Sequence, residues 1–230
     1  MADIKINGAT PSAFYYGGTA ASAVYYGSTK LWEAAPSGAV IGGKTYPTVT
    51  MPDGREWLAV NLDYAWTGLS VPTTGAMLSS SPQAMYYDYD EATYGWSGQK
   101  RGLLYNNYAV KYLETNKATL CPGWHVPTKA EFDTLVAAIG STNGAKLKST
   151  TGWTNAGNGT DDYGFTAYPS GRFDSLGFGG IDSAFRIWAT ISGAIATQAY
   201  FLALVAANQE ISVTTNNRQY QYSVRLIKDY

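Results

Sequence analysis

The chain has 230 residues, a length that suits one domain of ordinary size and a small accessory module. Only 14% of the residues are charged, the net charge is −1 and no basic run occurs. This argues against nucleic-acid binding, which needs a positive surface to release counterions. In place of charges the chain carries 25 Gly and 19 Tyr with many Ser, Thr and Asn residues, a mixture found in adaptable binding surfaces and in β-rich proteins generally.

A repeat opens the sequence: residues 12–19 (SAFYYGGT) return as residues 22–29 (SAVYYGST), each an aromatic strand closed by a Gly-containing turn. About 35 residues cannot bury a core alone. We therefore expect residues 1–35 to form a β-rich assembly or attachment module, residues 36–40 a linker, and residues 41–230 the ligand-binding domain.

The chain shows neither a secretory signal nor a membrane span. No basic segment followed by an apolar one occupies its start, and no apolar run reaches the ~18–20 residues that cross a bilayer. We expect synthesis in the cytoplasm without export, and no membrane span.

The main domain should begin with a hairpin. Residues 44–51 and 56–62 alternate as strands, and Asp53-Gly54 between them is a strong turn signal. Residues 67–83 are polar and rich in Gly, Ser and Pro, which predicts a loop, and residues 108–115 predict a short helix.

The clearest helix begins after Thr128, which forms a capping box with Glu131. Apolar residues at helical spacing give it one apolar face, and Gly140 is a suitable C-terminal stop. The last 45 residues, roughly, alternate as strands. These patterns predict a core that includes Trp57, Trp124, Phe132, Leu135, Val136, Trp188, Val224 and Leu226.

Cys121 and His125, the only cysteine and the only histidine, lie just before this helix. A single cysteine excludes an internal disulfide and a Cys-based zinc site. A nucleophile–base pair is one interpretation of the two residues. The simpler one, which we favour, is a packed loop.

Several motifs, in order along the chain, resemble the Fibrobacter succinogenes major paralogous domain over about residues 40–229. They include EWLAVNL (56–62), LYNNYAV (104–110), LCPGWHVPT (120–128), GFTAYPSG (164–171) and YSVR (222–225). The stretch from Gly123 to Phe132 is also similar to the helix-start motif of formylglycine-generating-enzyme-like proteins. Both resemblances imply an α+β, C-type-lectin-like fold with paired terminal strands, two helices and much irregular loop.

Domains of this family also serve as variable proteins of diversity-generating retroelements in gut bacteria and their phages. The resemblance thus implies a binding protein, not an enzyme, with a diversifiable C-terminal surface. A run of exposed apolar side chains indicates a contact surface, although Leu202 and Val205 fit ordinary strand core equally well. The expected ligand-binding residues are Ile187, Ile191, Ser192, Leu202, Ala203, Val205, Ala206, Ser212, Thr214, Gln219, Tyr220 and Gln221.

The expected partner is a protein or a glycan on a bacterial surface. The N-terminal repeat looks like small modules of phage structural proteins, which suggests a virion partner or self-association, with a cell-surface location as the alternative. Two other functions stay open, a formylglycine-generating-enzyme-like enzyme and a calcium-independent carbohydrate-binding module.

We expect no cofactor and no metal. Asp161 and Asp162 follow two asparagines in a loop and could ligate calcium, but a turn cluster is the simpler interpretation. A catalytic cysteine pair is impossible with one cysteine.

Overall fold

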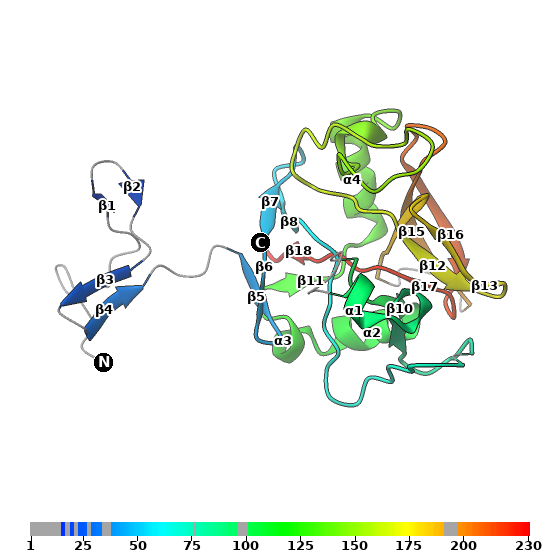
Figure 1. The fold of residues 1–230 in the computed structure, drawn as a ribbon, viewed down its shortest axis with the longest axis horizontal. Helices are drawn as coiled ribbons and strands as arrows, with labels where there is room; N and C mark the ends of the chain where they lie inside the picture. The colour runs from blue at the N-terminus through cyan, green and yellow to red at the C-terminus, as the bar shows by residue number, and fades with distance from the viewer. Residues whose placement is uncertain are drawn as a thin grey trace.

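The structure, a computed structural model, describes residues 38–75, 77–95, 101–190 and 197–230, together with the backbone of four short strands nearer the N-terminus. These strands pair in order as two antiparallel hairpins (Figure 1). Each Tyr-Tyr pair of the repeat lies in a strand, as the repeat predicts. The strands are β1 (Tyr15–Tyr16), β2 (Thr19–Ala20), β3 (Ala23–Tyr26) and β4 (Thr29–Glu33).

From Ala39 onward the strands form four antiparallel sheets. The first is the pair β5 (Ala39–Ile41) and β6 (Lys44–Tyr46), so a strand begins inside the predicted linker. The second has the order β11-β18-β8-β7, and its hairpin β7–β8 turns at Asp53-Gly54 as predicted. Its members are β7 (Thr48–Thr50), β8 (Glu56–Leu58), β11 (Trp124–His125) and β18 (Ile227–Lys228).

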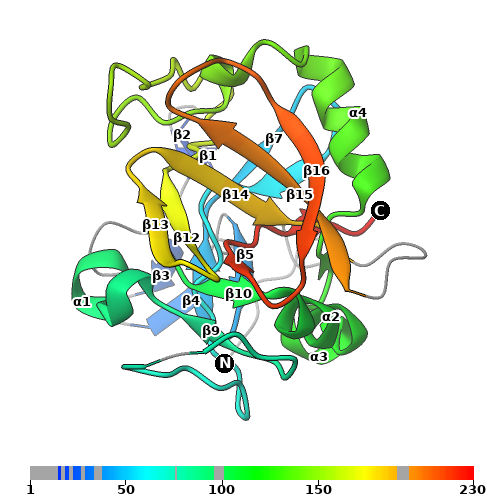
Figure 2. The same cartoon turned by 90° about the vertical axis from the view of Figure 1, so that its right-hand side faces the viewer.

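The third sheet has five strands in the order β13-β12-β17-β10-β9. They are β9 (Ala84–Met85), β10 (Leu104–Asn106), β12 (Ser170–Asp174), β13 (Gly177–Ile181) and β17 (Gln221–Tyr222). The fourth sheet, in the order β14-β15-β16, holds the C-terminal region (Figure 2). Its strands are β14 (Ala184–Trp188), β15 (Gln198–Val205) and β16 (Ser212–Asn217).

The two longest described helices are α2 (Asn107–Thr115) and α4 (Lys129–Ile139). The capping box of α4 is confirmed, since Thr128 Oγ1 accepts from the Glu131 amide and Glu131 Oε2 accepts from the Thr128 amide. The shorter helices are η1 (Tyr87–Tyr89), α1 (Glu91–Tyr94), α3 (Lys117–Leu120) and η2 (Gly144–Lys146). No helix of the described residues is both long and apolar enough to cross a membrane.

Two apolar clusters form the core. In one, Trp57 of β8 stacks on Phe132 of α4 with ring centroids 6.2 Å apart, which ties the second sheet to the helix. In the other, Trp188 stacks on Tyr222 at 4.4 Å and joins the third and fourth sheets. The predicted core residues are buried as expected, except that Val136 is only partly buried.

The α+β, C-type-lectin-like prediction is wrong. Most of the regular structure between residues 38 and 230 is strand, divided among four small antiparallel sheets with few helices. The physical reason is the dense spacing of glycines and turn residues, which ends most strands after two to five residues, as the strand bounds show. The domain is β-rich.

Candidate binding surface

Strand register divides the C-terminal sheet into two faces. Arg186 pairs with Ala203, and Ala203 pairs with Ser212, so these three side chains share one face, which we call the outer face. Ile187 and Leu202 also pair, and because side chains alternate along a strand they lie on the opposite, inner face. Figure 2 shows the three strands side by side.

The inner face is core. Ile187 and Leu202 are fully buried and pack in one apolar cluster with Leu135 and Phe132 of helix α4. The prediction that these two residues belong to a ligand-binding surface is therefore wrong. Their apolar character reflects their position between the sheet and the helix.

The outer face carries four of the predicted residues. Ser212 and Thr214 are exposed, Val205 is half-buried and Ala203 is 9% exposed. The hydroxyl groups of Ser212 and Thr214 make no hydrogen bond within the described part of the chain. Ser212 and Thr214 form the polar, exposed part of this face on β16, and Ala203 and Val205 form an apolar part on β15.

Two further predicted residues are buried. Ala206 is buried and packs closely against Gly157. A Cβ atom added to Gly157 would lie 2.8 Å from the Ala206 Cβ atom. Gln221 lies in β17, between Asn106 of β10 and Phe173 of β12. Neither fits a surface role, because each side chain fills space between packed segments.

The turn before β17 contributes the remaining described residues. Gln219 and Tyr220 are half-buried, and the Tyr220 hydroxyl lies 3.3 Å from the Ser175 hydroxyl at the tip of the β12–β13 hairpin. Ile191 and Ser192 lie outside the described residues.

An arginine pair borders the outer face. The Nη1 atoms of Arg172 and Arg186 stand 3.2 and 3.4 Å from the point where a Cβ atom on Gly180 would be, so both tips converge over this glycine. Arg172 Nε donates to Asp174. The side chain of Arg186 makes no hydrogen bond or ion pair with the described residues, and its Nη1 atom is shielded from water without an acceptor.

Tyr222 lies beneath Arg186, whose guanidinium carbon is 5.8 Å from the ring centroid. Burial raises the pKa of Tyr222 to about 12, so its hydroxyl stays neutral and accepts from Asn216 Nδ2 at 2.8 Å. Burial also lowers the pKa of Arg186, although an arginine remains charged in proteins. The site therefore holds two guanidinium groups and one carboxylate.

Arg172 and Arg186 are not among the site residues predicted from the sequence. A signal was present, because Arg186 is the one charged residue in the otherwise apolar strand Ala184–Trp188. Arg172 lies across from Gly179 in a hairpin rich in glycine. Only the packing of β12 against β14 brings the two side chains together.

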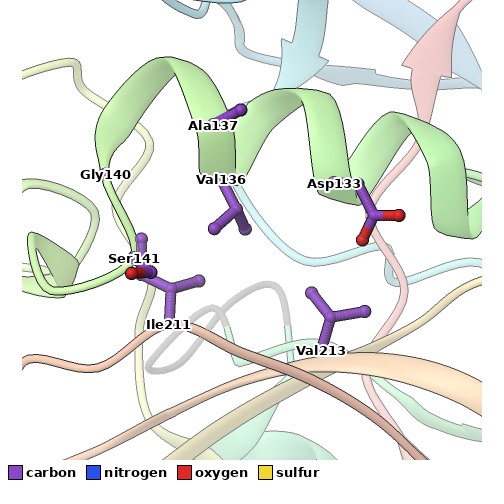
Figure 3. Close-up of a pocket in the computed structure, with 7 residues that line it drawn as sticks. All are labelled: Asp133, Val136, Ala137, Gly140, Ser141, Ile211 and Val213. Atoms are coloured by element: carbon purple, nitrogen blue, oxygen red, sulfur yellow. The ribbon is translucent and has the colours of Figure 1, made fainter.

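On the other side of β16 an open groove of about 440 Å³ separates this strand from helix α4. Figure 3 shows Val136 of the helix pointing toward Ile211 and Val213, with Asp133 at one end of the groove and Ser141, after the helix, at the other end beside Ile211. Asp133 already pairs with Lys129 at 2.6 Å. The groove is mainly apolar and offers few free polar groups, unlike the outer face.

A second hollow, of about 320 Å³, lies on helix α2. Tyr112 there is 44% exposed and stacks parallel to Trp66 with centroids 5.8 Å apart. Tyr108, one turn earlier, lies under the Arg218 guanidinium at 4.2 Å. Exposed aromatic faces of this kind can hold an apolar or sugar ring.

The Fibrobacter succinogenes major domain family matches residues 53–228. The chain belongs to this family. No curated protein matches it, and no solved structure does. The match covers the third and fourth sheets and the second sheet apart from β7, but neither the β5–β6 pair nor the N-terminal repeat.

In this Fibrobacter succinogenes major domain Cys121 and His125 do not form a nucleophile–base pair. Cys121 is fully buried, its Sγ atom lies 3.4 Å from the Trp124 carbonyl oxygen, and burial raises the pKa of its thiol to about 12. His125 instead contacts Asp229 through Nδ1 at 2.7 Å and Glu131 through Nε2 at 3.0 Å. The histidine thus joins the C-terminus to the start of helix α4.

The Asp161–Asp162 segment of the domain is built as a turn. Asp161 accepts from the Thr166 amide at 2.7 Å and from the Thr166 hydroxyl at 2.8 Å, so both carboxylate oxygens are occupied. Asp162 faces Lys146 at 3.9 Å. No group of three or more metal-binding side chains occurs among the described residues.

Proposed function

We propose that this domain is a binding module, not an enzyme, and that its ligand contacts the outer face of the C-terminal sheet. The observation that carries the proposal is the outer face itself, where the exposed hydroxyls of Ser212 and Thr214 share a sheet face with Arg186, whose guanidinium has no hydrogen-bond partner among the described residues. Hydrogen-bonding groups without internal partners are available to a ligand. The expected ligand is a protein or a glycan on a bacterial surface.

We further propose that evolution diversifies the exposed outer-face positions. Ser212 and Thr214 are exposed and Val205 is half-buried, so the identity of these side chains can change at small cost, within about 0.5 kcal/mol for surface substitutions. The resemblance to variable proteins of retroelements supports this proposal. Its test is the neighbouring DNA, where a reverse transcriptase gene and a near-copy of the 3′ end that differs only at adenines are expected.

The N-terminal repeat serves attachment in this proposal, on a virion partner or on another copy of the chain. Its support is the size of the repeat, which is too small to hold a core, and the family match, which begins only at residue 53. A virion location is the favoured one, and a cell surface is the alternative.

The binding role is tested with the full chain against a panel of labelled bacterial cells. The triple variant Val205→Tyr/Ser212→Tyr/Thr214→Tyr should lose binding to the cells that the natural chain binds. The matched control, Thr134→Tyr/Ala138→Tyr/Thr142→Tyr, alters three exposed positions on and after helix α4 and should bind unchanged. Equal binding by both triple variants would contradict the proposal.

A carbohydrate-binding role without calcium is the second candidate, favoured by the exposed Tyr112 in the hollow on helix α2. Stacking of a sugar ring on Tyr112 would make binding depend on that residue and not on the outer face. Loss of glycan binding in Tyr112→Ala, with the outer-face triple variant unaffected, would favour this candidate.

A further inference from the structure

We infer that the arginine pair of Arg172 and Arg186 binds the carboxylate of an acidic sugar held on the outer face. This inference rests on the proposed function and names the chemical class of its ligand. The fold leaves one positive charge of this arginine pair without a matching negative charge. Arg172 and Arg186 share one carboxylate, that of Asp174, and Arg172 Nε already uses it.

Two features of this arginine pair are unfavourable. One is a buried donor without an acceptor, and the other is the closeness of two positively charged guanidinium groups. An unsatisfied buried donor costs about 1–3 kcal/mol, and like charges in a partly buried site repel more strongly than in water. Arg186 Nη1 has no acceptor, and the charged or titratable groups that act on Arg186 are Tyr222, Arg172 and Asp174. Because Arg186 Nη1 is shielded from water, an anion reaches it only when the side chain turns outward, and an anion held by both guanidiniums then removes both penalties.

The shape of the site suits a carboxylate. A planar guanidinium donates two parallel N–H bonds to a carboxylate, and two guanidiniums can share its two oxygens. Glycine at 179 and 180 keeps side chains away from the arginine tips, since a Cβ atom on Gly179 would stand 3.1 Å from Arg172 Nη1. Across the strand ladder, Ala203 faces Arg186 with only a methyl group.

The surroundings of the pair favour a sugar over an acidic peptide. On the same sheet face as Arg186, two strands away, β16 offers the exposed hydroxyls of Ser212 and Thr214, which match ring hydroxyls. A protein ligand would need an apolar centre to its contact surface, and on this face the only partly exposed aliphatic side chain of β15 is Val205. A uronic acid supplies both the carboxylate and the hydroxyls.

The test is calorimetric titration of the full chain with tetragalacturonate and with its methyl ester, which keeps the hydroxyls but removes the charge. We expect the acid to bind and the ester to bind at least about tenfold more weakly. The reason is that a hydrogen bond to a charged group contributes ~1.5–3 kcal/mol, and a difference of 1.4 kcal/mol changes the dissociation constant tenfold. Binding of the acid should also weaken as salt is added.

Variants then locate the site. Arg186→Gln and Arg172→Gln should each weaken binding of the acid by about tenfold or more. Lys228→Gln removes one positive charge from β18, in another sheet, and should bind like the natural chain. Tyr112→Ala should also bind unchanged. Melting curves of all four variants confirm that they are folded before titration.

Three results would overturn the inference. The first is that the natural chain does not bind tetragalacturonate. The second is that Arg186→Gln and Arg172→Gln each bind it as tightly as the natural chain does. The third is that binding is lost in Tyr112→Ala alone. Tetraglutamate that binds as tightly, with the same dependence on the arginines, would assign the site to acidic peptides and also reject the sugar. If the outer-face triple variant still loses cell binding in any of these cases, the proposed function stands and only the ligand class falls.

Discussion

Arg186 and Ala203 stand directly opposite each other in the ladder between β14 and β15. The alanine offers no acceptor to the guanidinium, and no other described residue supplies one. Arg225 shows the opposite arrangement. Its guanidinium, in a side chain only 1% exposed, donates to Asn61 Oδ1 at 3.0 Å and to the Thr166 carbonyl at 2.7 Å.

The two arginines should therefore respond oppositely to removal. Arg186→Met deletes an unsatisfied donor, so the free energy of unfolding should stay equal or rise by about 1–3 kcal/mol. Arg225→Met leaves several buried acceptors without a donor, so the free energy of unfolding should fall by about 3–5 kcal/mol. Urea denaturation of the two variants beside the natural chain measures both changes. A clear loss of stability in Arg186→Met would mean that this arginine has a structural role.

Trp188 should be among the most sensitive core positions. It is fully buried, donates from Nε1 to the Tyr105 carbonyl at 2.8 Å, and contacts the rings of Phe201 and Tyr222. Trp188→Ala should lower the free energy of unfolding by about 3–5 kcal/mol. Leu176→Ala, at a side chain 88% exposed, should change it by less than about 0.5 kcal/mol. A loss below about 1 kcal/mol in Trp188→Ala would contradict the packing described.

The single histidine should give the fold a measurable pH dependence. Burial opposes protonation of His125, but its hydrogen bonds to Glu131 and Asp229 outweigh burial and raise its pKa above 6.5. A raised folded-state pKa means that the stabilisation is complete below the unfolded value near 6.5 and is lost as pH rises through the folded value. The melting temperature should fall from about pH 6 to about pH 8 in the natural chain, and less in His125→Gln.

Glu131, which contacts His125, should make the stability of the fold depend on pH in the acid range. Burial opposes its ionisation, but hydrogen bonds from His125 and Thr128 lower its pKa from 4.5 to about 2. Its contribution is therefore present above 4.5 and is lost as pH falls toward 2. Glu131→Gln should flatten this acid loss of stability. If Glu131→Gln loses stability at acid pH as the natural chain does, other carboxylates control this loss.

Calcium should have no effect on folding. Both oxygens of Asp161 already accept from Thr166, so melting curves with chelator and with added calcium should coincide. Asp161→Ala should lower the free energy of unfolding by about 1 kcal/mol through loss of these hydrogen bonds. A rise of several degrees on calcium addition would contradict this prediction.

Removal of residues 1–35 should leave the rest of the chain folded. In the described part of the chain, the strands of this segment pair as β1–β2 and β3–β4 and join no sheet of the main domain, and the family match begins at residue 53. The truncated chain should melt at the same temperature as the full chain, while its oligomeric state or its attachment to a partner changes. Light scattering and a melting curve test both parts, and an unfolded truncated chain would make the segment a structural element.

Local patterns predicted the elements that local interactions create. The capping box of Thr128 and Glu131 placed the start of helix α4, and Asp53-Gly54 placed the hairpin of β7 and β8. Both features depend on residues within a few positions of each other, so the sequence contains all that is needed to find them. The strand pattern predicted for roughly the last 45 residues is confirmed in part, since β15, β16, β17 and β18 lie there.

Which side of those strands faces solvent was decided by tertiary packing. Ile187 and Ala203 both suited a binding surface in the sequence, but helix α4 covers the side that holds Ile187 and leaves Ser212 and Thr214 open on the other. A period of two gives two faces and no rule for choosing between them when both contain apolar residues.

The arginine pair, the fold class and the environment of Cys121 depend equally on contacts between distant segments. Arg172 and Arg186 lie on strands of different sheets and meet only because β12 packs on β14. Short strands can assemble into one sheet or several with nearly the same local preferences, so the division into four sheets was not predictable from periodicity. The physical reason is that burial and charge balance are sums over neighbours in space, and the order of residues along the chain does not state which neighbours those are.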